Sequence, residues 1–172
     1  MTRAFVGVGS NIEPAENVRK ALDLLAEEMP VVGVSTVYET EAESQPEQPR
    51  YYNCIIEVET GATPAGLKQK LREIEESLGR IRTADKYAPR TIDLDLLVYE
   101  ELSVMTAELT LADLNIVERA YLAAGLAELA PDLALPGMGT ILSELAERLP
   151  KRGMRALNEY TAALRKEVLH GS

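Results

Sequence analysis

A strand–helix–strand pattern that occurs twice before residue 100 constrains the fold of this chain more than any other feature. It predicts strands at 3–9, 31–39, 52–60 and 92–99 and helices at 14–29 and 64–78. The apolar residues of the helices recur at the same steps in each, at Val18, Leu22, Leu25 and Met29 and at Leu67, Leu71, Ile74 and Leu78. We therefore predict an α+β, ferredoxin-like β-α-β-β-α-β sandwich, in which two helices cover one face of an antiparallel sheet. The other face is left for ligands or further elements.

The last third of the chain is predicted to be mostly helical, near 116–129, 140–149 and 154–169. The last helix carries Leu157, Tyr160, Leu164 and Val168 on one side, which indicates packing on the domain, with a dimer contact as the alternative. A length of 172 residues suits one domain. We expect a core at about 3–135, a C-terminal helical extension at about 140–169, and a monomer or homodimer.

Composition excludes several classes of function. A net charge of −10 argues against a nucleic-acid surface. The sequence has no apolar run of roughly 18 residues and no secretory signal, so we predict a cytoplasmic protein without a membrane partner. Cys54 is the only cysteine, and the only histidine, His170, lies at the C-terminal end. Histidine-based catalysis is therefore excluded, and any chemistry depends on carboxylates, arginines, lysines and backbone.

Two aspartates interrupt the apolar pattern of the fourth strand. Asp93 and Asp95 are two residues apart, so they point to one face of the strand, while Leu94 and Leu96 point to the other. Two carboxylates at this range repel each other unless a cation joins them. Magnesium suits such a pair because it prefers oxygen ligands and few protein carboxylates. The alternative, which is the better choice for an isolated Asp-x-Asp, is a solvated face.

Basic residues precede this pair in an otherwise acidic chain. The segment 79–91 contains Arg80, Arg82, Lys86 and Arg90. Arginine offers forked donors that match phosphate oxygens, so the segment predicts a polyphosphate site beside a metal site. Tyr87 could stack on a base or pack against its own loop. A solvated basic surface is the alternative for the whole segment.

The sequence KYAPRTIDLDLL at 86–97 closely resembles the signature of the 6-hydroxymethyl-7,8-dihydropterin pyrophosphokinase family. The resemblance includes GSN at 9–11, QPEQPRYYN at 45–53 and IEESLGRIR at 74–82, and it covers roughly residues 3–135. It implies a ferredoxin-like fold. It also implies transfer of diphosphate from ATP to the hydroxymethyl group of the pterin, with release of AMP, in folate biosynthesis.

The resemblance also implies roles for individual residues. Two Mg²⁺ ions would bind Asp93 and Asp95, and Arg80 and Arg90 would assist catalysis. The ATP site would be formed by Glu75, Arg82, Tyr87, Arg90, Leu96, Thr110 and Arg119. The pterin site would be formed by Thr40, Tyr51, Asn53 and Tyr121. There the two rings would stack on opposite faces of the pterin, and the asparagine amide would bind its polar edge.

The residues themselves leave simpler interpretations open. From spacing alone, Tyr51 and Tyr121 are better explained as half-buried aromatics. Asn53 could be a turn residue, and Glu75 a solvated helix residue. Residues 9–11 are best explained as the tight exit from the first strand, because no Gly-Lys-Ser/Thr follows as a Walker loop requires.

The chain departs from the family pattern near the expected ATP phosphates. Glu108 stands where well-known members have an arginine, and Asp113 where they often have a histidine. Residues 41–43 and Tyr87 also differ. Two further functions therefore remain open. One is a protein that binds pterin or nucleotide without catalysis or with altered specificity, and the other is a ferredoxin-like interaction module.

Overall fold

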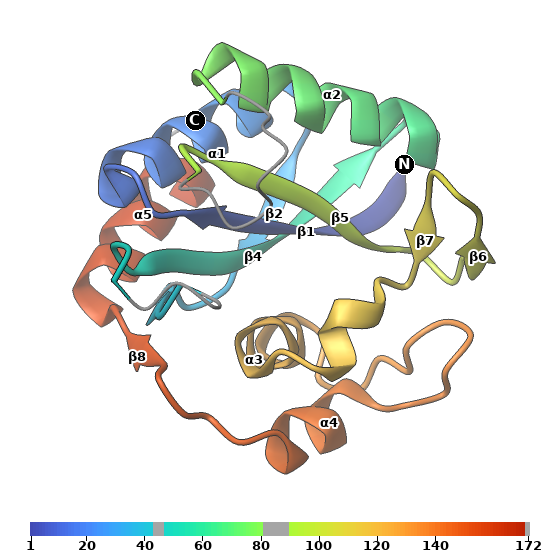
Figure 1. Cartoon of the computed structure of the whole chain (residues 1–172). Coiled ribbons are helices and arrows are strands. Elements are labelled where there is room, and N and C mark those ends of the chain that lie inside the picture. The colour runs from blue at the N-terminus through green and yellow to red at the C-terminus, as the bar shows by residue number, and fades with distance from the viewer. Residues whose placement is uncertain (43–46, 81–89, 171–172) are drawn as a thin grey trace.

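Helices cover both faces of a mostly antiparallel sheet in the computed structural model of the chain (Figure 1). The structure describes residues 1–42, 47–80 and 90–170. One face carries α1 (Pro14–Glu28), α2 (Pro64–Ser77) and α5 (Asn158–His170). The other face carries α3 (Ala120–Leu129), α4 (Leu142–Arg148) and the short 3₁₀ helix η1 (Leu114–Val117). No helix among the described residues is both long and apolar enough to span a bilayer.

The main sheet has the order β5-β1-β4-β3-β8, and β2 also pairs with β4. These strands are β1 (Thr2–Ser10), β2 (Val31–Val34), β3 (Tyr38–Thr40), β4 (Tyr51–Thr60), β5 (Asp93–Tyr99) and β8 (Arg155–Ala156). A separate hairpin consists of β6 (Val104–Met105) and β7 (Thr110–Leu111). Every pairing in the main sheet is antiparallel, which confirms the predicted α+β fold class with a ferredoxin-like order of elements.

The predicted strand at 31–39 is wrong in one respect, because residues 35–37 separate β2 from β3. Here side chains take part in the hydrogen bonding of the backbone. The Ser35 Oγ accepts from the Ile55 backbone N at 2.8 Å, and the Val37 backbone N donates to Thr161 Oγ1 at 2.9 Å. The Ser35 backbone N still donates to the Ile55 carbonyl at 2.9 Å, but these side-chain hydrogen bonds interrupt the regular ladder, so the alternating sequence does not continue as one strand.

The C-terminal elements also differ from their expected bounds. Residues 155–156 pair with β3, so α5 begins only at Asn158. The predicted helix at 116–129 is divided into η1 and α3. Leu164 of α5 is buried in the same apolar cluster as α1 and α2, which confirms that this helix packs against the rest of the chain.

Alternate residues of the strands contribute to two separate cores. Val6 and Val8 of β1 pack with Leu22 and other residues on the side of α1, α2 and α5. Phe5 and Ile55 pack with residues of α3 and α4 on the opposite side. Gly125 allows α3 to lie close to β4, since a Cβ there would be 2.5 Å from Ile55 Cγ1. The second core covers only part of its face, and the uncovered part forms a cavity.

Candidate active site

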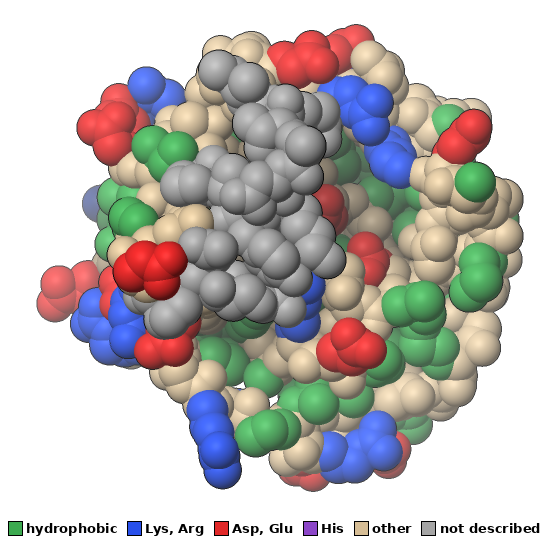
Figure 2. All heavy atoms as spheres, viewed as in Figure 1, with side chains coloured by type: hydrophobic (Ala, Val, Ile, Leu, Met, Phe, Trp, Pro, Cys, Tyr) green, Lys and Arg blue, Asp and Glu red, His purple; other side chains and the backbone are tan. Residues whose placement is uncertain are grey.

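A cavity of about 610 Å³ lies over β1, β4 and β5 beside the start of α3. This volume is in the range of small-molecule sites. Figure 2 shows charged side chains around a hollow near the centre of the view. Many of the residues expected to bind ligands line this cavity, namely Thr40, Tyr51, Asn53, Arg90, Asp93, Asp95, Arg119 and Tyr121.

The register of the three strands explains why the expected metal and pterin residues are close together. Gly9 of β1 pairs with Asn53 of β4 on one side and with Asp93 of β5 on the other, and Gly7 pairs with Asp95. A Cβ on Gly9 would lie 2.7 Å from Asn53 Oδ1, so this position needs a residue without a side chain. The glycines form the floor of the cavity, and the polar side chains stand on either side.

The two aspartates lie in different electrostatic surroundings. Asp93 accepts from Arg80 Nη1 at Oδ1 and from Arg90 Nη1 at Oδ2, both at 2.8 Å. Asp95 is exposed to the cavity as a residue, while its carboxylate lies among neighbouring side chains that shield it from solvent. Burial, followed by the charges of Asp93 and Asp113, raises the pKa of Asp95 to about 8. Asp95 is therefore the carboxylate that most needs a cation to become ionised.

This pair suits magnesium held together with a phosphate ligand. No group of three or more metal-binding side chains occurs in the described part of the chain. Mg²⁺ usually takes one or two protein carboxylates and completes its coordination with waters and substrate phosphates. Asp93 and Asp95 supply that number of oxygen ligands on a single face of β5.

Glu75 holds the arginine next to Asp93. It is only 3% exposed, and its Oε2 accepts from Arg80 Nη1 at 2.6 Å and from the Leu94 backbone N at 2.7 Å. Glu75 does not line the main cavity. The interpretation of Glu75 as a solvated residue is wrong, because its carboxylate joins α2 to β5 and positions Arg80.

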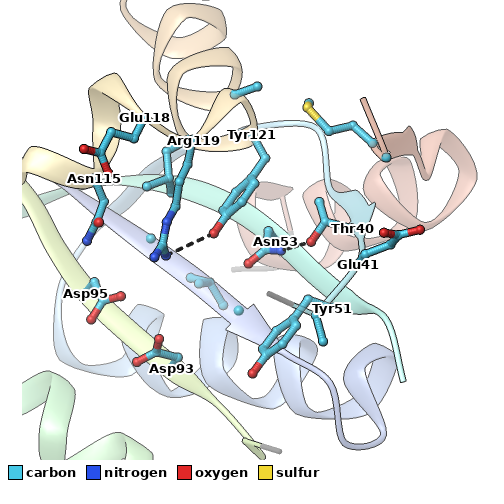
Figure 3. Close-up of a pocket in the computed structure, with 18 of the residues that line it drawn as sticks. Thr40, Glu41, Tyr51, Asn53, Asp93, Asp95, Asn115, Glu118, Arg119 and Tyr121 are labelled. Carbon is cyan, nitrogen blue, oxygen red and sulfur yellow. Dashed lines mark hydrogen bonds between the residues drawn. The ribbon is translucent and has the colours of Figure 1, made fainter. Parts of the chain in front are cut away.

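The opposite end of the cavity combines two aromatic rings with an amide. Figure 3 shows Tyr121 entering from α3 and Tyr51 from β4, with Asn53 between them. Asn53 Nδ2 donates to Thr40 Oγ1 at 2.7 Å, and Arg119 Nη1 donates to the Tyr121 hydroxyl at 3.4 Å. Burial raises the pKa of Tyr51, so its phenol stays neutral. A flat heterocycle could stack on these rings and hydrogen-bond to the amide.

A smaller hollow of about 370 Å³ adjoins the main cavity and shares Asp95 and Asp113 with it. Thr110 and Leu96, both expected at the ATP site, line this hollow, although Leu96 is mainly a core residue with 7% exposure. Lys68 Nζ donates to the backbone carbonyl of Glu108. A lysine thus supplies positive charge beside the position where the family arginine is missing.

Asp113 also has a structural role. Its Oδ1 accepts from the Asn115 backbone N at 2.8 Å and caps η1. The carboxylate that replaces the family histidine therefore begins the helix that leads to Arg119 and Tyr121. The negative charge of Asp113 also acts on the cavity, because its repulsion helps to raise the pKa of Asp95.

Residues 10 and 11 do more than end the first strand. Asn11 is 1% exposed, and its side chain joins two loops by accepting from the Arg90 backbone N at 2.8 Å and donating to Gln48 Oε1 at 3.2 Å. Ser10 Oγ donates to the Thr91 carbonyl at 2.6 Å. These residues position Arg90, and their occurrence in the GSN block was the available signal. Arg82 and Tyr87 lie outside the described residues.

Comparison with known proteins assigns the chain to a family. The model of the 7,8-dihydro-6-hydroxymethylpterin-pyrophosphokinase (HPPK) family matches residues 5–131. A 2-amino-4-hydroxy-6-hydroxymethyldihydropteridine pyrophosphokinase of Pseudomonas aeruginosa is 36% identical over 159 residues, which cover 90% of this chain and 96% of the relative. That of Methylorubrum extorquens is 37% identical over 153 residues, or 87% of this chain and 96% of the relative.

Longer proteins match over part of their length. The folic acid synthesis protein fol1 of Schizosaccharomyces pombe is 34% identical over 98% of this chain, which spans 23% of that protein. A crystal structure of Plasmodium falciparum HPPK-DHPS with pteroate shares the fold, with a TM-score of 0.70 at 12% identity. The match covers 99% of this chain and 46% of the Plasmodium chain. The chain belongs to the HPPK family of pterin pyrophosphokinases, as the resemblance of residues 86–97 predicts.

Proposed function

We propose that this chain uses the main cavity to transfer diphosphate from ATP to the hydroxymethyl oxygen of 6-hydroxymethyl-7,8-dihydropterin, with release of AMP. Family membership implies this activity in folate biosynthesis and ATP as the co-substrate. The observation that carries the proposal is the position of Asp93 and Asp95 in the same cavity as Tyr51, Asn53 and Tyr121.

The pterin would bind between Tyr51 and Tyr121. Asn53 uses one N–H on Thr40, so its carbonyl and its second N–H are available to the polar edge of the ring. Stacking and hydrogen bonding would fix the hydroxymethyl group on the side of β5. Most of the rate enhancement would then come from holding this oxygen in line with the β-phosphorus.

Asp93 and Asp95 would hold two Mg²⁺ ions, which neutralise phosphate charge and lower the pKa of the substrate hydroxyl when bound. The hydroxymethyl oxygen would form a bond to the β-phosphorus as the bond to the α-phosphate oxygen breaks, and the hydroxyl proton would pass to water. Arg90, with Arg80 held by Glu75, would stabilise the negative charge on the transferred group. We assign the same task to Arg82 from the family pattern alone.

Labelled ATP tests the proposal directly. The protein is incubated with Mg²⁺, 6-hydroxymethyl-7,8-dihydropterin and ATP labelled on either the α- or the γ-phosphate. We expect α-label in AMP and γ-label in the diphosphorylated pterin, in equal amounts. ADP as the nucleotide product, or no pterin-dependent turnover with folded protein, would contradict the proposal.

A second candidate function is binding of pterin and nucleotide without turnover. Asp113 and Glu118 add negative charge to the cavity that must hold a polyphosphate. Repulsion of this kind weakens ATP binding by on the order of 1 kcal/mol per solvated charge. Calorimetric titration with both ligands, combined with the AMP assay, separates the two functions, because only the second predicts binding with no AMP.

A further inference from the structure

The segment that joins α4 to α5 lies beside the main cavity. We call residues 150–156, which include β8, the C-terminal strap. The strap leads from the side of the sheet that carries α3 and α4 to α5 (Figure 1). It follows the region matched by the family model, which ends at residue 131.

The strap forms part of the wall of the main cavity. Pro150, Arg152, Gly153 and Met154 line this cavity together with Thr40, Tyr51 and Asn53. The strap therefore contributes to the site as well as connecting two helices.

Strand pairing places Met154 at the pterin end of the cavity. Glu39 of β3 pairs with Arg155 of β8 in an antiparallel register. Thr40 follows Glu39, and Met154 precedes Arg155. The antiparallel register therefore places Thr40 and Met154 side by side. In the sheet order β5-β1-β4-β3-β8, this is the end opposite Asp93 and Asp95.

Both ends of the strap are firmly held. Before it, Leu142 and Leu145 of α4 are 0% and 4% exposed in the second core. After it, the Leu157 backbone N donates to the Val37 carbonyl at 2.8 Å. Arg155 Nη2 also donates to Glu39 Oε1 at 3.2 Å. Met154 is thus held beside Thr40 by the strand pairing of the residues that follow it.

We propose that Met154 contacts the edge of the bound pterin that lies farthest from the aspartate pair, and that it helps to determine affinity for the pterin but not for the nucleotide. This inference rests on the proposed function. A thioether is flexible and polarizable, and it packs well against the edge of an aromatic ring. Met154 is half-buried at the cavity wall. Its side chain can therefore move to fit a bound ring, and little apolar surface is exposed to water when the site is empty.

A binding experiment tests the contact. The fluorescence of 6-hydroxymethylpterin is titrated with protein in the presence of Mg²⁺ and a non-hydrolysable ATP analogue. Met154→Ala should weaken pterin binding about tenfold, because it removes the thioether contact, while the Kd of the analogue stays within about twofold. Met154→Leu should restore most of the affinity. Met105→Ala on β6, where the side chain is 73% exposed, is the matched control and should change neither Kd.

A second measurement uses the wild-type protein and does not depend on the folding of a variant. Dilute hydrogen peroxide oxidises accessible methionines, and mass spectrometry follows Met154 and Met105 separately. We expect 6-hydroxymethylpterin with the ATP analogue to slow oxidation of Met154 about fivefold, while the analogue alone does not and Met105 is unaffected.

The outcomes separate this inference from the function on which it rests. Wild-type protein that neither binds the pterin nor turns it over would overturn the proposed function, and the inference with it. Wild-type protein that binds the pterin without protecting Met154 would overturn the inference alone. So would a Met154→Ala variant that binds the pterin as Met105→Ala does, or one that loses pterin and nucleotide affinity equally.

Discussion

The two faces of the sheet are built from alternate residues of the same strands, but they differ in what covers them. On one face, α1, α2 and α5 enclose Val6, Val8 and Leu94 in an apolar core. On the other, α3 and α4 cover only part of the sheet, and Asp93 and Asp95 face the uncovered cavity. The same strand can therefore contribute stability through one set of side chains and chemistry through the next. Substitutions on the two faces should separate stability from activity.

The largest effect on activity is expected on the face of the sheet that carries the cavity. Asp95→Ala should reduce pterin-dependent AMP formation by about 10³-fold, because it removes one of two proposed magnesium ligands. Stability should not fall, since Asp95 belongs to neither core. AMP assays and thermal unfolding measure the two quantities. A variant that keeps full activity would refute the metal role.

The reverse result is expected on the face of the sheet that α1, α2 and α5 cover: a loss of stability without a loss of activity. Leu22 of α1 is fully buried, so Leu22→Ala should lower the free energy of unfolding by about 2–5 kcal/mol. Below the melting temperature, kcat should stay within about twofold of wild type. Urea denaturation and steady-state kinetics test this prediction. A large loss of kcat in folded Leu22→Ala would show that the two faces are not independent.

Arg90 tests the cations around the carboxylate pair. Arg90→Ala should lower turnover more than tenfold, because Arg90 binds Asp93 and lines the cavity. Arg90→Lys should recover only part of the rate, since lysine lacks the forked donor geometry. Arg19→Ala on the surface of α1 is the control and should be neutral. If Arg90→Ala behaves like this control, Arg90 is only a surface charge.

The pH dependence of the free energy of unfolding tests the surroundings of Asp95 on the cavity side of the sheet. The pKa of Asp95 is raised to about 8 in the folded protein, whereas an unfolded aspartate titrates near about 3.9. Without metal, the folded state therefore binds a proton that the unfolded chain releases, and Asp95 lowers stability as pH rises from about 4 to about 8. Asp95→Asn should remove this decrease in urea denaturation. Equal slopes for variant and wild type would contradict the shift.

The smallest effect is expected at the second hollow. Lys68→Met should raise the KM for ATP about threefold, because one exposed cation contributes less than about 1 kcal/mol. Lys70→Met is a suitable control on the same helix, since Lys70 pairs with Glu28 at 3.1 Å and does not line the hollow. Equal KM values for the two variants would show that Lys68 does not replace the missing arginine.

Elements set by local patterns were predictable, and elements set by distant partners were not. β1, β4 and β5 lie within a residue of their expected bounds, because alternation is a property of the strand itself. The break between β2 and β3 depends on contacts with residues such as Thr161, more than a hundred positions away. β8 has only two residues, which is too short to produce a recognisable pattern.

The same distinction applies to the cavity. The period of two by itself placed Asp93 and Asp95 on one face, and the apolar steps of the helices indicated which face would be covered. Only the tertiary structure decided that Arg80 and Arg90 neutralise Asp93 while Asp95 is left among carboxylates, and that Met154 lines the cavity together with Tyr51 and Asn53. Side-chain direction along a strand is a local property of the backbone. Charge balance and the shape of a cavity depend on segments that are brought together only by folding.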